Sequence, residues 1–522
     1  MDEDLCRKRF RMIIPTYPAF NIYSRVAHRT TALGPVCVAS VVNRMHGWRV
    51  EVIDENNYRK LGPRLTSGHP DHATLQSIRH ADVVGLYGGL SSTALRIHEL
   101  AQFYKRSGAI TIAGGQHFVG ENIREALENG LDFVVIGEGE HAIKELLSVI
   151  QDGGDPASVD GIAFMKNGEM VETPPRPPIT DFEALPLPDF SLLRYARIKR
   201  YPVGWMRGCN MNCEFCTVKG KPRASSPERV VEQMAALMES CNARRFFLVD
   251  DQFGHSLPDT MQLCELLANY QKAVGARFDI VVQIRLDLGD NSELLKAMRK
   301  AGIRNLCIGF ESPIEEELAA MNKHVRAADM LALTKRYHRA GFFVHGMFIF
   351  GYPLRDAEPL KMPVEQRVKE FRHFIRKSQL DTIQVMLPVP LPGTALTERL
   401  AAENRIFSHE CIGWEYYDGN FPLFMPDAPL TPRDMQRSIR KIMGRFYRFR
   451  NMFVIGRNIL IFPALFFALG DIRLGWRIWY RTWRNGLVRF GGWMIFHQWV
   501  SQFSQGRFGE KLHRAEELRS SS

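Results

Sequence analysis

The chain has 522 residues, enough for two or three domains, and its hydrophobic content of 45% is ordinary for a globular protein. Nine cysteines, an odd number without framework spacing, exclude a disulfide-built fold, and no secretory signal is evident, so we expect a reduced, cytoplasmic protein. The net charge of +11 is uneven: residues 433–522 carry 17 Lys/Arg and 5 Asp/Glu, and the rest carries 51 against 52.

Residues 1–150 form the first predicted domain, in which short apolar strands alternate with helical stretches. The strands are expected near residues 10–15, 48–54, 81–87, 109–115 and 133–137. This alternation predicts a doubly wound, Rossmann-like parallel sheet, which binds ligands at the carboxyl ends of its strands. Those ends carry Gly88, Gly114, Gly115 and Gly137, and glycine lets a backbone approach a ligand closely.

Residues 151–195 are predicted to be a proline-rich linker, and residues 196–405 resume the strand–helix rhythm. Six strands are expected, at 201–206, 245–250, 278–285, 305–311, 342–350 and 382–387. Six parallel strands predict an incomplete (β/α)6 barrel with its chemistry at the carboxyl ends of the strands. Residues at or just beyond those ends include Cys209, Asp250, Asp251, Arg285 and Glu311.

Three cysteines follow the first barrel strand as Cys209, Cys213 and Cys216. Thiolates are soft ligands for zinc or iron–sulfur clusters. A structural zinc site is almost always closed by four ligands, whereas a cluster held by three thiolates leaves one iron open for chemistry. A fourth thiolate could come from a distance, so the spacing alone leaves a structural zinc site open.

The stretch from Met206-Arg207-Gly208-Cys209 to Cys216 resembles the cluster loop of the radical S-adenosylmethionine (SAM) enzymes. The resemblance implies that the three cysteines bind a [4Fe–4S] cluster whose fourth iron chelates SAM. Reductive cleavage of SAM would then give a 5′-deoxyadenosyl radical. The aromatic Phe215, just before the third cysteine, also fits the family pattern.

The resemblance also implies SAM-binding residues farther along the barrel. Asp250 or Asp251 would accept the SAM ammonium, although the usual Gly-Gly-Glu is absent there. The Arg285 fork would pair with the SAM carboxylate, and Glu311, in Gly-Phe-Glu-Ser, would reach the ribose or the amino group. For each residue, a strand-end salt bridge or cap is the alternative.

Residues 1–150 resemble the cobalamin-binding domain that often precedes the radical SAM barrel. The resemblance rests on Leu33-Gly34-Pro35, on Gly114-Gly115-Gln116-His117 and on Ile136-Gly137-Glu138-Gly139-Glu140. It implies cobalamin contacts at Gly88, Gly114, Gly115, His117, Gly137 and Glu138. The Asp-x-His-x-x-Gly motif that carries the lower-ligand histidine is absent, and His117 is equally explained as a loop or helix-cap histidine.

Residues 406–522 are predicted to be a helical, basic C-terminal segment. Ile459–Leu469 is too short an apolar run to span a membrane. Five of the eight tryptophans lie between Trp476 and Trp499, interleaved with arginines, which favours an anionic membrane surface as a partner of residues 433–506. A helical cap on the barrel and, less favoured, nucleic-acid binding are the alternatives.

The predicted function is cobalamin-dependent radical methylation of an unactivated carbon in an apolar, lipid-like small molecule. An electron donor such as flavodoxin or ferredoxin is implied, and the protein is expected in the cytoplasm, associated peripherally with a membrane. The alternatives are a radical SAM oxidoreductase or cyclase on the same scaffold, and a non-enzymatic carrier or sensor that binds a cluster or corrinoid.

Overall fold

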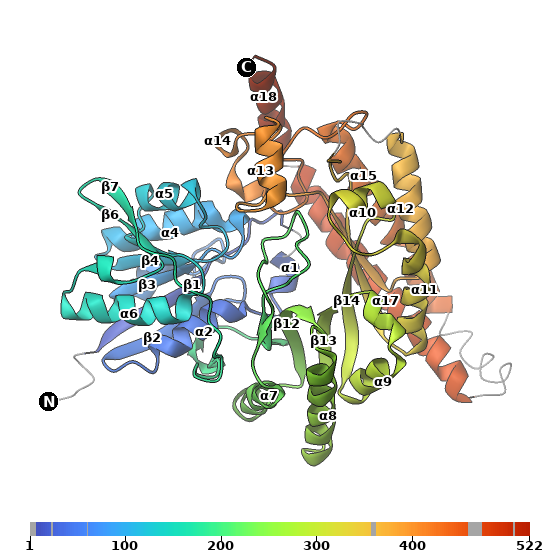
Figure 1. The fold of residues 1–522 in the computed structure, drawn as a ribbon, viewed down its shortest axis with the longest axis horizontal. Coiled ribbons are helices and arrows are strands. Elements are labelled where there is room, and N and C mark those ends of the chain that lie inside the picture. The colour runs from blue at the N-terminus through green and yellow to red at the C-terminus, as the bar shows by residue number, and fades with distance from the viewer. Residues whose placement is uncertain are drawn as a thin grey trace.

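The computed structural model describes residues 7–21, 24–59, 61–355, 362–457, 472–504 and 507–521. Two largely parallel sheets stand side by side, each with its own helices, and C-terminal helices lie around the second sheet (Figure 1). The predicted α/β class, with a Rossmann-like part, a barrel-type part and a helical C-terminal part, is confirmed.

The first sheet has eight strands in the order β7-β6-β5-β4-β3-β1-β2-β8. The pairs among β1 to β5 and the β2–β8 pair are parallel, whereas β6 and β7 add an antiparallel edge. The central strands are apolar on both faces, as strands covered by helices on both sides must be. Their bounds are β1 Lys8–Ile14, β2 Trp48–Asp54, β3 Val83–Tyr87, β4 Ile110–Gly114, β5 Phe133–Val135, β6 Ile162–Lys166, β7 Glu169–Glu172 and β8 Leu193–Arg194.

Helices cover both faces of this sheet, which makes it doubly wound. Helices α2 (Leu33–Val42) and α6 (Gly139–Asp152) share one apolar core with the sheet. Helices α3 (His72–Ile78), α4 (Ala94–Arg106) and α5 (Glu121–Glu128) form another on the opposite face. A short α1 (Ser24–Ala27) precedes α2.

The stretch predicted as a linker contributes structure to the first sheet, because β6, β7 and β8 all come from it. Its proline-rich part runs from β7 to β8, and Ile179 and Phe182 within it are buried. The boundaries drawn from the sequence between linker and domains stay a prediction.

The second sheet has the six predicted strands, all parallel, in the order β16-β15-β14-β13-β12-β9. Their bounds are β9 Tyr201–Val203, β12 Arg245–Phe253, β13 Asp279–Ile284, β14 Ile303–Glu311, β15 Phe343–Ile349 and β16 Thr382–Met386. The helices that join them are α7 Pro227–Cys241, α8 Leu257–Ala273, α9 Ser292–Lys300, α10 Glu315–Ala320, α11 Ala327–Arg339 and α12 Val364–Ser378. A two-stranded ribbon of β10 (Met206–Arg207) and β11 (Arg223–Ala224) frames the cysteine loop.

The C-terminal residues are helical in the described ranges. Their helices are α13 Ala395–Ala402, α14 His409–Ile412, α15 Pro432–Phe446, α17 Ile472–Ser504 and α18 Phe508–Ser521, with a 3-10 turn η6 at Trp414–Tyr416. No helix among the described residues is long and apolar enough to cross a membrane. The apolar run Ile459–Leu469 lies outside the described residues.

Helix α17 is fixed across the amino-terminal ends of β14, β15 and β16. The Arg484 guanidinium donates to Asn305 at 2.7 Å and stacks on the Phe343 ring. Arg489 donates to the Leu380 carbonyl at 2.7 Å. Arg484 and Arg489 therefore pack α17 against the barrel as a cap, which was one of the alternatives left open by the sequence.

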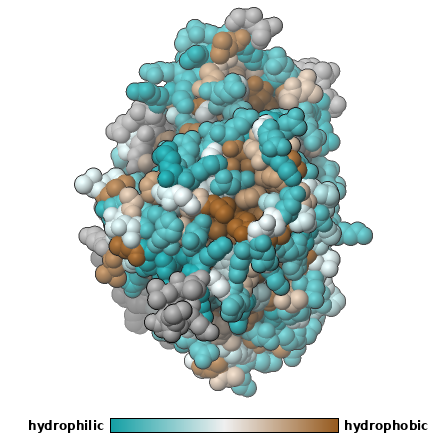
Figure 2. Space-filling model, turned by 90° about the vertical axis from the view of Figure 1, so that its left-hand side faces the viewer, coloured by the Kyte–Doolittle hydropathy of each residue, from teal (hydrophilic) through white to brown (hydrophobic). Residues whose placement is uncertain are grey.

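Viewed from the side of the first sheet, the surface is mostly hydrophilic, with one apolar area in a hollow near its centre (Figure 2).

A buried ion pair stabilises the first sheet. Arg11 of β1 donates to Glu51 of β2 at 2.7 Å, and both side chains are almost wholly buried. Glu51→Ala is expected to lower the free energy of unfolding by about 3–5 kcal/mol, because it leaves the guanidinium buried without a countercharge. Urea unfolding of the variant measures this. Glu169→Ala, at an exposed position of β7, is the control, and equal losses for both variants would contradict the role of the pair.

Candidate functional site

The three cysteines lie in the loop between β10 and β11, at the carboxyl end of the first barrel strand. The loop opens at Gly208, whose φ of +91° is unfavourable for other residues and where a Cβ would stand 2.6 Å from the Lys221 carbonyl. The three thiols are close enough to influence one another electrostatically, and burial raises the pKa of Cys213 and of Cys216.

The three thiols of this loop are soft ligands of the kind that hold an iron–sulfur cluster. In a [4Fe–4S] cluster each thiolate binds its own iron, so the loop supplies three of the ligands that such a cluster needs.

A buried carboxylate within the motif fastens the loop to the barrel. Glu214 accepts hydrogen bonds from the Tyr352 hydroxyl at 2.7 Å and from Arg399 at 2.9 and 3.1 Å. Its amide donates to the Met321 carbonyl at 3.0 Å. Sequence reasoning missed this clamp, and the only signal for it was an acidic residue between the second and third cysteines.

The predicted aromatic residue Phe215 packs edge-on against Tyr352, with ring centroids 6.2 Å apart. The same tyrosine that holds Glu214 therefore also supports the side chain next to Cys216.

The adjacent acids Asp250 and Asp251 near the end of β12 both bind backbone amides around the cysteine loop. Asp250 accepts from the amides of Trp205 at 2.8 Å and Met206 at 3.1 Å. Its second oxygen is buried and has no hydrogen-bond partner among the described residues. Asp251 accepts from the Gly208 amide at 2.8 Å. The free oxygen of Asp250 is a position where an ammonium could bind.

The pKa of Asp250 makes its role testable. Burial, reinforced by the nearby charge of Asp251, raises the pKa of the Asp250 carboxyl to about 7. The unfolded chain loses this proton near pH 4, so the folded state holds more protons between about pH 4 and about pH 7. The free energy of unfolding is therefore expected to fall as the pH rises through this window. In Asp250→Asn this part of the fall is absent.

Urea titrations of wild type and Asp250→Asn, at about pH 5 and about pH 7.5, measure the difference. We expect the variant to gain stability relative to wild type at the higher pH. Parallel behaviour of the two proteins would show that Asp250 is ionised normally in the folded state.

Arg285 and Glu311 already have charged partners. The Arg285 guanidinium forms a two-pronged pair with Asp287, its Nε at 2.9 Å, and both side chains are partly exposed. Glu311, with a φ of +59°, binds Lys323 at 2.8 Å. The Glu311–Lys323 pair lies close to the cluster loop, because the Lys323 charge acts on both Cys213 and Cys216. The structure brings Glu311 to the cysteines, and Lys323 is a neighbour that sequence reasoning missed.

The glycines of the first sheet differ in what fills the space beside them. A Cβ on Gly115 would stand 2.5 Å from the Gly88 backbone, and one on Gly88 would meet the Phe118 ring at 2.4 Å. A Cβ on Gly114 would stand 3.4 Å from the Val135 carbonyl oxygen, whereas a Cβ on Gly137 would have no atom within 4 Å. Gly115 is thus required by the close Gly88 backbone and Gly88 by the Phe118 ring, whereas the space beside Gly137 is unfilled.

His117 lies beneath the C-terminal segment. Its Nδ1 bonds the Ser91 hydroxyl at 3.1 Å, its ring meets Trp414 edge-on at 4.9 Å, and its Nε2 has no hydrogen-bond partner among the described residues. Burial lowers its pKa to about 3. The imidazole is therefore neutral, the form that can coordinate a metal, and Trp414 covers it.

Ion pairs join the cysteine loop to the loop that follows β5. Arg207, two residues before Cys209, binds Glu140 at the start of α6, a carboxylate that is 3% exposed, and reaches Glu138 at 3.3 Å. Arg223 of β11 binds Glu138 at 2.9 and 3.0 Å. Both guanidiniums stand over the Phe182 ring. The Glu138 carboxylate, predicted as a cobalamin contact, is engaged by this bridge.

A second contact joins the cysteine loop to the glycine loop that follows β4. The Thr217 hydroxyl, next to Cys216, lies 3.3 Å from the Gln116 amide oxygen. The carboxyl-terminal edges of the two sheets therefore meet at the cysteine loop.

Comparison with known proteins identifies both halves. Residues 203–366 match the radical SAM superfamily, and residues 22–147 match the B12 binding domain. An uncharacterised methyltransferase of Pyrococcus horikoshii is 27% identical over 455 residues, which cover 84% of this chain and 93% of the relative. An anaerobic magnesium-protoporphyrin IX monomethyl ester cyclase of Rubrivivax gelatinosus is 24% identical over 65% of this chain and 60% of its own length. A hopanoid C-2 methylase of Rhodopseudomonas palustris is 25% identical over 43% of this chain and 42% of its own length.

Two solved structures share the fold. The cobalamin-dependent SAM radical enzyme OxsB, solved with aqua-cobalamin and SAM, superposes over 99% of this chain and 84% of its own, with a TM-score of 0.63 and 14% identity. The radical SAM methyltransferase TsrM from Kitasatospora setae, solved with tryptophan and a SAM analogue, superposes over 76% of each chain with a TM-score of 0.60 and 17% identity.

The cysteine loop at the mouth of a six-stranded barrel and these matches define a radical SAM enzyme. The chain therefore combines a B12-binding domain, over residues 22–147, with a radical SAM domain, over residues 203–366. The two matched domains are those expected for the cofactors predicted from the sequence, a [4Fe–4S] cluster with SAM and a cobalamin.

Proposed function

We propose that this enzyme methylates an unactivated carbon of an apolar small molecule in a cobalamin-dependent reaction. The observation that carries the proposal is the direct contact between the cysteine loop and the two ligand-binding loops of the first sheet, through Arg207–Glu140, Arg223–Glu138 and Thr217–Gln116. Methyl transfer through cobalamin needs the cobalamin edge to lie next to the cluster loop, and these three contacts hold it there.

Each group of residues has a proposed task. Cys209, Cys213 and Cys216 would hold the cluster, and Phe215, Asp250, Asp251, Arg285 and Glu311 would hold SAM. Gly88, Gly114, Gly115, His117, Gly137 and Glu138 would form the edge that receives cobalamin, with Glu138 acting through its bridge to Arg223. When bound, these cofactors supply a carbon-centred radical and a methyl group; the protein orients them and excludes water.

SAM binding requires Arg285 to exchange its partner. In the structure the guanidinium is held by Asp287, so the SAM carboxylate would replace or share that contact. Asp250 needs no such exchange, since its second oxygen is without a partner among the described residues. A SAM ammonium there would favour the ionised form of Asp250 and lower its pKa.

The relatives divide between two reaction types. The hopanoid methylase supports an apolar, lipid-like substrate and methyl transfer. The cyclase supports a radical oxidation or ring closure on the same scaffold, which we keep as the second candidate. The electron donor, a flavodoxin or ferredoxin, and peripheral membrane association stay predictions.

Product mass separates the two candidates. The reconstituted enzyme is given SAM, a reductant and, in parallel, a hopanoid and a magnesium-porphyrin ester. A hopanoid product heavier by one methylene unit supports the proposal. A porphyrin product that has lost hydrogens, with no methylated hopanoid, would replace it with the cyclase function.

A further inference from the structure

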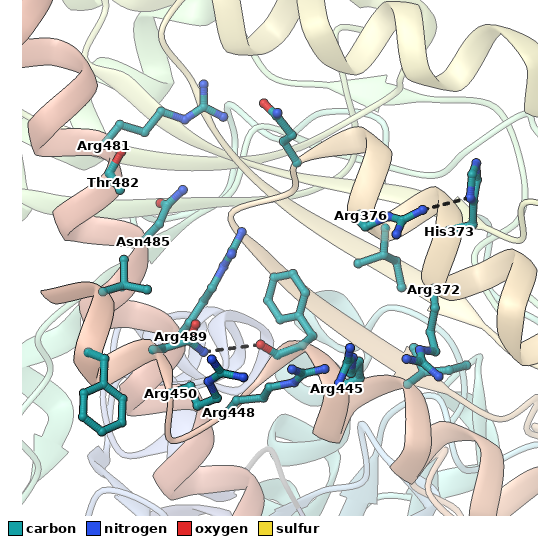
Figure 3. Close-up of a pocket in the computed structure, with 18 of the residues that line it drawn as sticks. Arg372, His373, Arg376, Arg445, Arg448, Arg450, Arg481, Thr482, Asn485 and Arg489 are labelled. Carbon is teal, nitrogen blue, oxygen red and sulfur yellow. Dashed lines mark hydrogen bonds between the residues drawn. The ribbon is translucent and has the colours of Figure 1, made fainter. Parts of the chain in front are cut away.

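A large basic cavity lies among α12, α15, residues 448–457 and α17, away from the cysteine loop. Its volume is about 1190 Å³, and eight arginines and one lysine line it: Lys369, Arg372, Arg376, Arg445, Arg448, Arg450, Arg457, Arg481 and Arg489. None of its lining residues, all of them within the described ranges, is acidic. Figure 3 shows arginine side chains from all of these elements turned toward a common space.

Only some of these basic side chains interact with other groups of the protein. Arg481 lies 3.6 Å from Asp381, and Arg489 is tied to the Leu380 carbonyl and stands over the Phe446 ring. The side chains of Arg445, Arg448 and Arg450 have no ion pair with any acidic residue in the described part of the chain. These three charges, carried on the end of α15 and the turn after it, are available to an anionic partner.

Exposed apolar side chains border the same cavity. Phe453, which lines it, is 62% exposed, and its neighbours Phe449 and Met452 are 43% and 39% exposed. On α17, Trp476, Tyr480, Leu487, Met494 and Ile495 are also exposed. Eight of the 17 large apolar side chains described as exposed therefore lie in residues 449–453 and on α17, the two segments that also contribute to the lining of the cavity.

We propose that this face, defined by the basic cavity and by Phe449, Met452 and Phe453, docks on an anionic lipid bilayer. Guanidiniums pair well with lipid phosphates, and partly exposed aromatic rings prefer the headgroup level. The combination of unpaired cations and exposed rings on one surface is what an interfacial contact requires. The inference goes beyond the proposed reaction and depends on none of its residues.

Single-stranded nucleic acid fits this face less well. Such ligands stack their bases on open aromatic faces. Here Trp479 stacks on Trp483, and Trp476 on Tyr480, with interplanar angles of 9° and 14°. The rings of each pair lie nearly parallel with centroids 5.9 and 6.3 Å apart, so each ring has one face directed at its neighbour and fewer open faces remain for bases.

The docking face lies toward the amino-terminal ends of β14 to β16, because α17 is anchored there through Arg484 and Arg489. The cysteine loop lies at the opposite, carboxyl ends of the barrel strands. A docked molecule would therefore keep its cofactor edge directed away from the bilayer.

Vesicle co-sedimentation of the full-length protein tests the proposal. We expect pelleting with vesicles of phosphatidylglycerol and phosphatidylcholine at low salt, little with phosphatidylcholine alone, and release by high salt. The triple variant Arg445→Glu/Arg448→Glu/Arg450→Glu is expected to partition at least about 100-fold more weakly. Phe453→Ser, at a position that is 62% exposed, is expected to weaken binding several-fold.

The matched control is Lys272→Glu/Lys296→Glu/Lys335→Glu, which reverses three exposed charges on α8, α9 and α11. It is expected to pellet more than the cavity triple variant by at least about tenfold, although it has the same net charge. If both triple variants lost vesicle binding equally, the loss would follow from net charge alone and the proposal would be overturned. Tight binding of a single-stranded oligonucleotide or an acidic protein, without vesicle binding, would also overturn it.

Discussion

Cys213→Ala is expected to lose its iron–sulfur cluster and, with it, reductive cleavage of SAM. Cys213 is the most buried of the three motif thiols, and its carbonyl accepts a hydrogen bond from Lys219 at 3.0 Å. Without this thiolate, a second iron of the cluster lacks a protein ligand, in addition to the iron that is open to SAM. Iron content should fall from about four per chain to well below one after anaerobic reconstitution.

The control for this experiment is Cys241→Ala at the end of α7. Cys241 is also partly buried, but it lies outside the cysteine loop. We expect its iron content and 5′-deoxyadenosine production to match those of wild type. Full iron loading of Cys213→Ala would show that the cluster is held elsewhere.

Glu140→Gln is expected to separate radical formation from methyl transfer. The Glu140 carboxylate holds Arg207, two residues from the first cysteine, against the first sheet. The neutral amide cannot neutralise the Arg207 guanidinium. We therefore expect the cysteine loop to shift relative to the edge of the first sheet. When two groups must react in a fixed geometry, a displacement of about 1 Å lowers the reaction rate roughly 100-fold.

We therefore expect 5′-deoxyadenosine production within about threefold of wild type, while transfer of a labelled methyl group falls about 10–100-fold. Glu145→Gln, on the same helix α6, removes the partner of Arg176 on the outer surface and should leave both rates unchanged. If both activities of Glu140→Gln fell together, Glu140 would be a stability residue rather than a positioning residue.

The sequence predicted those features that local patterns encode. Buried parallel strands are short apolar runs, so all six barrel strands could be placed. The cysteine loop could be placed because its ligands are neighbours in the chain. Asp250 and Glu311 could be placed near the cysteine loop because strand ends gather at one edge of a parallel sheet, and their roles toward SAM stay predictions.

What the sequence did not predict depends on distant partners. Arg223 and Glu138 are 85 residues apart, and Arg399 and Glu214 are 185 apart. A charged residue on a loop shows no preference in its sequence for one distant partner over another. The strands β6, β7 and β8 were missed because proline-rich neighbours made their region resemble a linker.

The C-terminal arginines show the same limit in another form. Composition favoured a membrane surface as their partner and left a helical cap on the barrel as an alternative. The structure divides them: Arg484 and Arg489 fix α17 to the barrel, whereas Arg445, Arg448 and Arg450 carry charge that no acidic residue in the described part of the chain neutralises. Only tertiary contacts could separate these two groups.

The central claim is that one site, formed where the two sheets meet, brings SAM and cobalamin together. The most direct test reconstitutes the protein anaerobically with iron, sulfide and cobalamin, adds a reductant and methyl-labelled SAM, and measures cofactor content and the label. We predict about four irons and about one corrinoid per chain, with label recovered in the corrinoid fraction. Cluster loading and SAM cleavage without bound corrinoid or transferred label would contradict the claim and leave radical oxidation as the function.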